Sequence, residues 1–372
     1  MTGELGLYLH IPFCRSKCVY CDFPSYPGML DYEDTVIDRM IGELEERSAR
    51  LGRPPVSTVY IGGGTPSILR PALFLRLLKA ADRCFPFLPG AEVSVEANPG
   101  TLEAAFIDAA LEGGVNRVSL GVQSANERLL RLLGRIHRFR DAERAVLMLR
   151  AAGIHNVNLD MMLGLPGQTT DDVRDTLKKL LSLSPVHMSC YGLIPEEGTP
   201  LYEHLRDGTW TLPDEDTERD MYELCRSTLA SNGFGQYEIS NFALPGMRCR
   251  HNLNCWNRCE YVGVGVSAAG FIGRTRYKNP STIPGYLKGE APEITVLTPE
   301  DERFESVMLG LRLTDGLSDA DFTARHGMTL RDAFGDRLDG PIGSGLLTFD
   351  NGQLKLTRRG MDLQNTVLVQ LL

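Results

Sequence analysis

Short apolar runs rich in β-branched residues alternate with longer, helix-periodic stretches along the first half of the chain. The short runs predict buried strands. The longer stretches, in which apolar residues recur every three or four positions, predict helices. The expected strands cover residues 5–12, 57–61, 91–96, 116–122, 156–163 and 186–193. The expected helices cover residues 32–51, 69–84, 102–112, 126–133, 141–152 and 170–183. Strands with helices between them predict an α/β fold with a parallel sheet. The six units fit a partial (β/α)6 barrel, and a doubly wound sheet is the alternative.

The pattern changes after residue 193. A helix is expected over residues 214–232, and residues 251–271 are predicted to be irregular and rich in glycine. The rest of the chain predicts a helix near residues 300–311, a hairpin of strands 346–349 and 353–356, and a last helix over 358–371. Helices followed by a hairpin predict a small α+β, winged-helix-like C-terminal domain. The expected domains are a barrel over 1–200, a linking segment over 201–295 and the small domain over 296–372.

Polar and glycine residues follow the predicted strands where each strand ends. They are Cys14, Gly62–Gly64, Glu96, Gln123 and Asp160. In parallel α/β folds the carboxyl ends of the strands carry the active site, so we expect these residues to meet at one mouth of the barrel.

The composition of the 372 residues, 42% hydrophobic and 23% charged, is that of an ordinary globular protein. The formal net charge of −9 argues against non-specific binding to nucleic acid or anionic lipid. No apolar run approaches the roughly 18 residues of a membrane span, and the start MTGELGLYLH lacks the features of a secretory signal. We therefore expect a cytoplasmic protein with no nucleic-acid partner and no integral membrane segment.

Three of the nine cysteines, Cys14, Cys18 and Cys21, lie within eight residues. An odd number of cysteines without an export signal argues against a disulfide framework, and thiolates are soft ligands suited to iron–sulfur clusters or zinc. Three thiolates leave one iron of a [4Fe–4S] cluster without a protein ligand, so this iron can bind a small molecule. A zinc ion would need a fourth ligand, for which His10 is the candidate. Three other cysteines lie in apolar patterns and are expected to be buried thiols: Cys84, Cys190 and Cys225.

The spacing C-x3-C-x2-C directly after the first strand resembles the cysteine motif of the radical S-adenosylmethionine (SAM) superfamily. The resemblance implies a partial (β/α)6 barrel, a [4Fe–4S] cluster on the three cysteines, and SAM bound to the open iron through its amine and carboxylate. Reduction then cleaves SAM to methionine and a 5′-deoxyadenosyl radical in this superfamily. Gly62-Gly63-Gly64-Thr65-Pro66 resembles the motif that holds the methionyl amine, and its glycines would let backbone amides approach the ligand.

Further motifs resemble those of the family around the oxygen-independent coproporphyrinogen III dehydrogenase HemN and the haem chaperone HemW. They are YLHIPFC at 8–14, GGGTPS at 62–67, GVQS at 121–124, DMMLGLPGQT at 160–169, YEISNFA at 237–243 and HNLNCW at 251–256. The resemblance runs from Tyr8 to the C-terminus. Carried over by position, it implies SAM contacts from Tyr8, Tyr20, Gly63, Gly64, Thr65, Glu96, Gln123, Arg135 and Asp160.

Two features resemble the chaperone branch of this family. The dehydrogenase carries a further cysteine at the position of Phe23, and it has a long segment ahead of the motif, whereas Cys14 here lies near the start. The chaperone branch also has an H-N-x-x-Y-W motif linked to haem, which residues 251–256 match except that Cys255 replaces tyrosine. This match implies that His251 binds haem through its imidazole.

Two alternatives concern the same region. His251 and Trp256 can instead pack the linking segment against the barrel, because single histidine and tryptophan residues are ordinary in cores. By spacing alone, Cys249, Cys255 and Cys259 with His251 form a candidate second metal site.

The resemblance therefore implies a radical-SAM-type haem chaperone that binds a [4Fe–4S] cluster, SAM and haem, and that delivers haem to client haemoproteins. The alternatives are an oxygen-independent coproporphyrinogen III dehydrogenase, a HemN-like radical SAM methyltransferase, and a zinc-binding scaffold. The sequence also leaves a homodimer open.

Overall fold

The computed structural model describes residues 5–372, and the first four residues of the predicted barrel domain lie outside the described residues. The frame of the molecule is a sheet of 12 strands. Its strands are β1 (Gly6–Ile11), β4 (Val56–Gly63), β5 (Phe87–Ala97), β6 (Arg117–Gln123), β7 (Asn156–Leu163), β8 (His187–Gly192), β9 (Gly235–Gln236), β10 (Asn241–Ala243), β11 (Tyr261–Gly265), β12 (Ala269–Ile272), β13 (Thr275–Lys278) and β14 (Glu293–Val296). The strand order is β14-β13-β12-β11-β1-β4-β5-β6-β7-β8-β10-β9. Every neighbouring pair from β11 to β8 is parallel, and the pairs outside this range are antiparallel.

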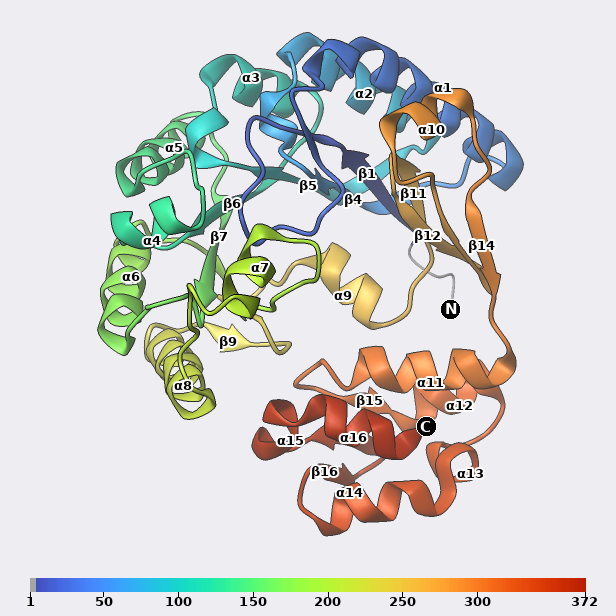
Figure 1. Cartoon of the computed structure of the whole chain (residues 1–372). Helices are drawn as coiled ribbons and strands as arrows, with labels where there is room; N and C mark the ends of the chain where they lie inside the picture. The colour runs from blue at the N-terminus through green and yellow to red at the C-terminus, as the bar shows by residue number, and fades with distance from the viewer. Residues whose placement is uncertain (1–4) are drawn as a thin grey trace.

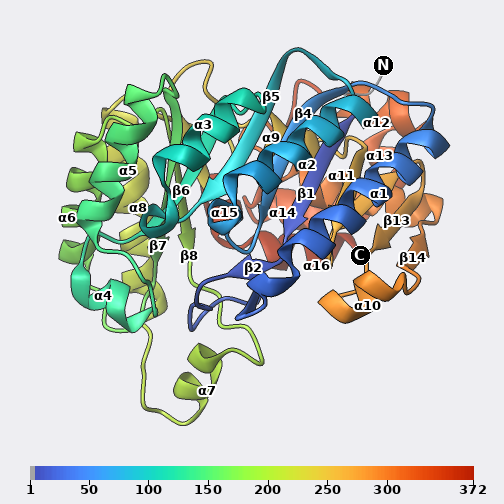
Figure 2. The ribbon, with the colours of Figure 1, turned by 90° about the horizontal axis from the view of Figure 1, so that it is seen from above.

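Helices cover the outer face of the curved sheet (Figure 1). They are α1 (Glu33–Leu51), α2 (Pro71–Cys84), α3 (Ala104–Glu112), α5 (Phe139–Ala151), α6 (Thr170–Ser182) and α8 (Glu215–Ser231). Viewed from above, α4 (Glu127–Leu132), α7 (Pro200–Arg206) and β2 (Phe13–Cys14) gather at one edge of the barrel (Figure 2). This edge holds the carboxyl ends of the parallel strands, where the sequence predicts the site.

Side chains alternate along each strand, so that apolar ones pack under the outer helices and polar ones face the interior of the barrel. On β6, Val118, Leu120 and Val122 are buried in the hydrophobic core under the helices, whereas Arg117 and Ser119 line the interior of the barrel. The strand β7 repeats this pattern. An α/β barrel whose inner face is polar can bind a ligand there, because only its outer face is needed for packing.

The predicted fold class is confirmed, and local signals explain several boundaries. The predicted strand over residues 156–163 coincides with β7, and the other predicted parallel strands overlap the observed ones. At the start of α6, Thr169 and Asp172 form a capping box, in which each side chain accepts a hydrogen bond from the other residue's backbone amide. At the end of α1, Gly52 adopts a left-handed conformation with φ of 75°.

Two predictions were wrong in detail. Residues 251–271 are not irregular: they hold most of helix α9 (Arg250–Trp256) and strand β11, which pairs in parallel with β1 and adds a seventh parallel strand. The expected last helix over 358–371 is divided into α15 (Arg358–Asp362) and α16 (Gln364–Leu371). The interruption lies at Leu363, whose φ and ψ of −118° and 29° are not helical.

The C-terminal domain has a hydrophobic core of its own and lies beside the open side of the barrel (Figure 1). Its elements are α11 (Pro299–Gly310), β15 (Leu317–Ser318), α12 (Asp319–His326), α13 (Leu330–Phe334), α14 (Asp339–Gly343), β16 (Leu347–Asp350), β17 (Gln353–Leu356), α15 and α16. Helix α10 (Ile283–Lys288) precedes this domain in the chain. Arg258 joins the two parts through ion pairs of 3.1 Å each to Glu302 and Glu305 of α11. The residues of this second core begin at Val307, and the boundary near residue 296 stays a prediction. The boundary at residue 200 stays a prediction, since one core spans both sides of it.

Candidate functional site

A cavity of about 590 Å³ opens at the carboxyl ends of the parallel strands. Its walls bring together most of the residues that the sequence singled out. These are Cys14, Cys18, Tyr20, Cys21, Gly63, Gly64, Thr65, Glu96, Gln123, Arg135 and Asp160. Two predicted site residues, Tyr8 and His251, do not line it. The convergence of strand ends that was expected from the sequence is therefore observed for all five strands concerned.

The three cysteines belong to one loop, which the strand pair β2 and β3 (Tyr26–Pro27) closes at its base. The loop is fixed by backbone hydrogen bonds to its surroundings: Val19 N donates to the Leu133 carbonyl at 3.2 Å, and Leu201 N donates to the Val19 carbonyl at 2.9 Å. Its thiols meet polar neighbours, because Cys14 Sγ lies 3.3 Å from Thr65 Oγ1 and Arg135 Nη1 donates to Cys18 Sγ at 3.5 Å. Hydrogen bonds to the sulfur atoms are a usual part of the protein environment of iron–sulfur clusters.

The donor set of this loop fits an iron–sulfur cluster better than a zinc ion. Both ring nitrogens of His10 are already in use, since Nδ1 lies 3.0 Å from the Tyr8 hydroxyl and Nε2 lies 2.9 Å from the Pro24 carbonyl oxygen. His10 is therefore not free to be the fourth zinc ligand. Within residues 5–372, no three His, Cys, Asp or Glu side chains are gathered closely enough for one metal ion. A cluster in which each thiolate binds a different iron does not need that close approach.

The candidate second metal site near α9 consists of Cys249, Cys255, Cys259 and His251. The Cys249 thiol donates to Glu92 Oε1 at 3.4 Å, and His251 bonds to Thr58, so these two side chains have partners of their own. The region described by the structure holds no metal-binding group there. The alternative of a second metal site thus has only the cysteine spacing in its favour, because two of its four candidate ligands are engaged elsewhere.

The glycine triplet allows the cysteine strand to lie directly on the end of β4. Gly63 has φ of +105°, a conformation that other residues rarely adopt. The Gly64 amide donates to the Ile11 carbonyl at 2.8 Å, and the Gly63 amide donates to Glu96 Oε2 at 3.2 Å. These amides are thus used inside the fold and are not free to bind a ligand. Contact between the glycine triplet and the methionyl amine stays a prediction.

Two buried carboxyl groups face the cavity. Glu96 accepts a hydrogen bond from the Tyr60 hydroxyl at 2.8 Å, and burial raises the pKa of Glu96 to about 7 against the effect of that bond. Asp160 accepts hydrogen bonds from Asn158 Nδ2 at 2.6 Å and from Ser119 Oγ at 3.3 Å, and burial also raises the pKa of Asp160. A cationic ligand, or one with hydroxyl groups, would offset the cost of ionising these groups away from water.

Gln123 and Arg135 complete the mouth. Gln123 has φ of 68° at a shift of register in β6, and its Oε1 accepts a hydrogen bond from the Tyr191 hydroxyl at 2.9 Å. Non-glycine residues in this conformation are uncommon and are often found at functional sites. Arg135 donates to the Gly121 carbonyl, and its Nε is buried without a partner. That unused donor suits the carboxylate expected from the family resemblance.

Tyr8 lies one layer behind the cavity wall. Its hydroxyl bonds to His10, and its ring lies 6.4 Å from the ring of Tyr60, centroid to centroid. Tyr8 thus supports His10, which lies beside Gly63, and Tyr60, which bonds to Glu96. A direct contact of Tyr8 with SAM stays a prediction.

His251 is buried inside the barrel on α9, with 5% of its surface exposed. Its Nδ1 lies 3.0 Å from Thr58 Oγ1, and its ring stacks on Tyr60 with centroids 5.1 Å apart. Burial lowers the pKa of the His251 imidazole to about 4, so the ring is neutral at physiological pH. Its neighbours Asn252 and Trp256 line the cavity. The position matches the packing alternative, and its role toward haem stays a prediction.

Several cavity residues were missed from the sequence. Arg117 and Ser119 on β6, Asn158 on β7, Glu238 after β9, and Arg312 from the C-terminal part all line the same space. The signal for the strand residues was present: polar side chains alternate with apolar ones at positions where a wholly buried strand would be apolar throughout. Glu238 and Arg312, which pair at 3.1 Å, are far apart in the chain, and no local pattern indicates their contact.

Comparisons with known proteins agree with the geometry. Residues 8–180 match the model of the Radical SAM superfamily, and residues 297–363 match the model of the HemN C-terminal domain. The chain is 36% identical over 369 residues to "Heme chaperone HemW" of Lactococcus lactis subsp. lactis, covering 98% of this chain and 96% of the relative. It is 36% identical over 373 residues to "Heme chaperone HemW" of Escherichia coli, covering 98% and 97% of the two chains.

A solved structure of coproporphyrinogen III oxidase (HemN) from Escherichia coli, described as a radical SAM enzyme, superposes with a TM-score of 0.86 over 99% of this chain and 90% of the other. At 24% sequence identity this likeness supports the fold alone. The full-length matches decide the family: this chain belongs to the HemW family within the radical SAM superfamily.

Proposed function

We propose that this protein is a haem chaperone that binds a [4Fe–4S] cluster, SAM and haem, and that it delivers haem to client haemoproteins. The relatives that it matches along their whole length are named heme chaperones. The observation that carries the proposal is that three thiols from one loop share a cavity with Glu96 and Asp160. This is the arrangement that a cluster with an adjacent cationic ligand requires.

The side chains divide between the two resident groups. Cys14, Cys18 and Cys21 would hold the cluster. SAM would lie against Glu96 and Asp160, with Gln123 and Arg135 as hydrogen-bonding partners and with Tyr20, Gly63, Gly64 and Thr65 as the adjoining wall. A reduced cluster held by these cysteines would supply an electron to SAM. This chain's own residues exclude water from the buried carboxyl groups and hold the cysteine loop against the strand ends.

For haem, His251 is the ligand that the family motif implies. To reach a haem iron, its imidazole would have to leave Thr58 and the Tyr60 ring, since it does not line the cavity. A haem titration of wild type and His251→Ala tests this role. A weakened affinity and a shifted Soret band in the variant would support ligation by His251. An unchanged spectrum would assign His251 to packing.

The alternative of a coproporphyrinogen dehydrogenase shares the same cavity and fold. The discriminating experiment incubates the cluster-loaded, haem-loaded protein anaerobically with an apo-haemoprotein, and in parallel supplies SAM, a reductant and coproporphyrinogen III. The proposal predicts transfer of the Soret absorbance to the acceptor and no multiple-turnover porphyrin product. Several equivalents of 5′-deoxyadenosine formed together with porphyrin product would contradict a chaperone without turnover.

Two further predictions are kept as part of this proposal. They are the cytoplasmic location and the identity of the partners as haem and client haemoproteins. Of the helices in residues 5–372, none combines the length and the apolar character needed to cross a bilayer.

A further inference from the structure

Arg117 is a buried cation in the cavity wall that has no bonding partner. It is the first residue of β6, it is 2% exposed, and it lines the same cavity as the cysteines. Its Nε is enclosed and makes no hydrogen bond. Throughout residues 5–372, no hydrogen bond, ion pair or aromatic stacking reaches its guanidinium. Buried charges in proteins are nearly always paired, so such a group points to a missing partner.

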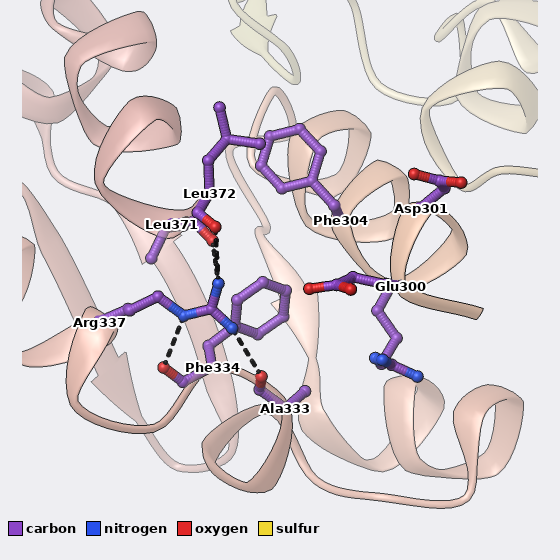
Figure 3. A pocket seen from close by; sticks show the side chains of 9 residues that line it. Glu300, Asp301, Phe304, Ala333, Phe334, Arg337, Leu371 and Leu372 are labelled. Atoms are coloured by element: carbon purple, nitrogen blue, oxygen red, sulfur yellow. Dashed lines mark hydrogen bonds between the residues drawn. The ribbon is translucent and has the colours of Figure 1, made fainter. Parts of the chain in front are cut away.

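Two other arginines, the buried Arg258 and the exposed Arg337, both have partners. Arg258, with 5% of its side chain exposed, makes two ion pairs and stacks over Phe271. Arg337 lines a smaller cavity of about 220 Å³ in the C-terminal domain (Figure 3). Figure 3 shows that its guanidinium donates to the backbone carbonyls around it: those of Ala333, Phe334, Leu371 and Leu372. Arg337 is exposed, so the buried Arg258 is the closer comparison: it is paired with two carboxylates, whereas Arg117 is paired with none.

The acidic residues near Arg117 do not fill this role, because each has other partners. Glu92 accepts hydrogen bonds from the backbone amides of Arg250 at 2.9 Å and of His251 at 3.1 Å, at the start of α9. Glu96 is held by Tyr60 and the glycine triplet, and Asp160 by Asn158 and Ser119. None of these carboxylates lies within ion-pair distance of Arg117. Glu92 is near enough to raise the pKa of Arg117 through its charge.

The charge of Arg117 is permanent. Burial opposes the charge, but nearby groups, among them the carboxylate of Glu92, outweigh burial and raise the pKa of Arg117 above its ordinary value. A guanidinium presents its donors as a planar fork, which matches the two oxygens of a carboxylate. The ligands of the proposed function carry such groups.

We propose that Arg117 binds a carboxylate group of a ligand that occupies this cavity. Two ligands can supply that group: the methionine moiety of SAM, or a propionate of haem. The haem source rests on the proposed function, whereas the SAM source needs only the radical SAM site. In either case Arg117 is a binding residue at the wall of the cavity, in addition to Arg135 at its mouth.

The test compares ligands with and without the carboxylate. Full-length, cluster-loaded protein is titrated anaerobically with SAM and decarboxylated SAM, and separately with haem and haem dimethyl ester. Wild type is compared with Arg117→Gln, which removes the charge. Loss of a hydrogen-bonded ionic contact should raise the dissociation constant of the carboxylate ligand by about 10-fold to 100-fold. The matching ligand without the carboxylate should bind wild type and variant about equally, as in a double-mutant cycle.

Two variants guard against a purely structural effect. Arg248→Gln is the matched control, because Arg248 pairs with Asp315 at 3.0 Å, stacks over Tyr237 and does not line the cavity. Arg117→Lys keeps the charge and replaces Arg117→Gln in the test if Arg117→Gln does not fold. The affinity of Arg117→Lys for SAM or haem should then fall less than the affinity of the neutral variant Arg117→Met for the same ligand.

The outcomes show whether the carboxylate comes from SAM or from haem, and they test the role of Arg117 separately from the proposed chaperone function. A selective loss for SAM or for haem supports the inference and names the source of the carboxylate. Equal losses for both members of a ligand pair, or no loss for either pair, would overturn it. If wild type binds no haem, the proposed function fails, and the SAM pair alone decides the role of Arg117.

Discussion

Replacing Gly64 with alanine should prevent the cysteine loop from lying against the end of β4. The Gly64 amide donates to the Ile11 carbonyl at 2.8 Å, so two backbone segments touch at this point. A Cβ atom on Gly64 would lie 2.9 Å from the Phe13 carbonyl carbon and 3.0 Å from the Ile11 carbonyl oxygen. Carbon atoms in contact prefer separations of about 3.5–4.0 Å, so the segments would have to move apart by roughly 0.6 Å or more.

The clash should weaken both folding and cluster binding. The obstructing atoms belong to the backbone, so no side-chain rotation relieves the contact, and overpacking of this kind costs about 1–3 kcal/mol. The segment that must move carries Cys14, the first predicted cluster ligand. We expect Gly64→Ala to lower the urea midpoint of the apo-protein. The variant should also retain less iron and sulfide per chain after anaerobic reconstitution.

Gly343→Ala is the matched control, because a Cβ there would meet no atom within 4 Å. This variant should unfold like wild type, or slightly later, and should load a full cluster. A Gly64→Ala protein with wild-type midpoint and wild-type iron content would refute the argument that this close approach requires glycine.

Three other predictions follow from the site and the domain contact. Because burial raises the pKa of Glu96 from 4.5 to about 7, the folded chain holds a proton that the unfolded chain has lost between these pH values. The free energy of unfolding should thus fall by about 3 kcal/mol as pH rises through this window. Urea unfolding at several pH values should show this slope flattened in Glu96→Gln, and an unchanged slope would contradict the assignment. Arg258→Met leaves the carboxylates of Glu302 and Glu305 with fewer partners, which should destabilise the contact between the barrel and the C-terminal domain by about 3 kcal/mol. Hydrogen exchange in α11 should then be faster, and unaltered exchange would show that Arg258 does not hold the two parts together. Cys18→Ser should abolish the cluster's visible absorption while urea unfolding of the apo-protein changes by less than about 1 kcal/mol, and a variant with a full cluster would remove Cys18 from the ligand set.

The period of hydrophobic residues was sufficient to predict six of the seven parallel strands and the helices that cover them. Each βα unit repeats the same contrast between a short apolar run and an amphipathic helix, and the strand over residues 156–163 was predicted to the residue. The position of the site followed from topology, because parallel strands all end at one edge. This is why residues as distant as Cys14 and Asp160 could be expected in one cavity.

Contacts between distant segments were beyond the reach of local pattern. The strand β11 is short and glycine-rich, so its pairing with β1 is determined by the tertiary fold and not by its propensity. The place of His251 depends on Thr58 and Tyr60 of β4, and the use of the Gly64 amide depends on Ile11. Motif spacing indicated that these residues matter, but only the packing shows which groups they touch.

The measurement that tests the central claim most directly is an anaerobic haem titration of the cluster-loaded wild-type protein, followed by its Soret absorbance. The account predicts saturable binding near one haem per chain, with a stable iron and sulfide content throughout the titration. A Soret absorbance that increases without saturation, as for haem free in solution, would contradict the haem chaperone and leave a radical SAM protein with a different ligand.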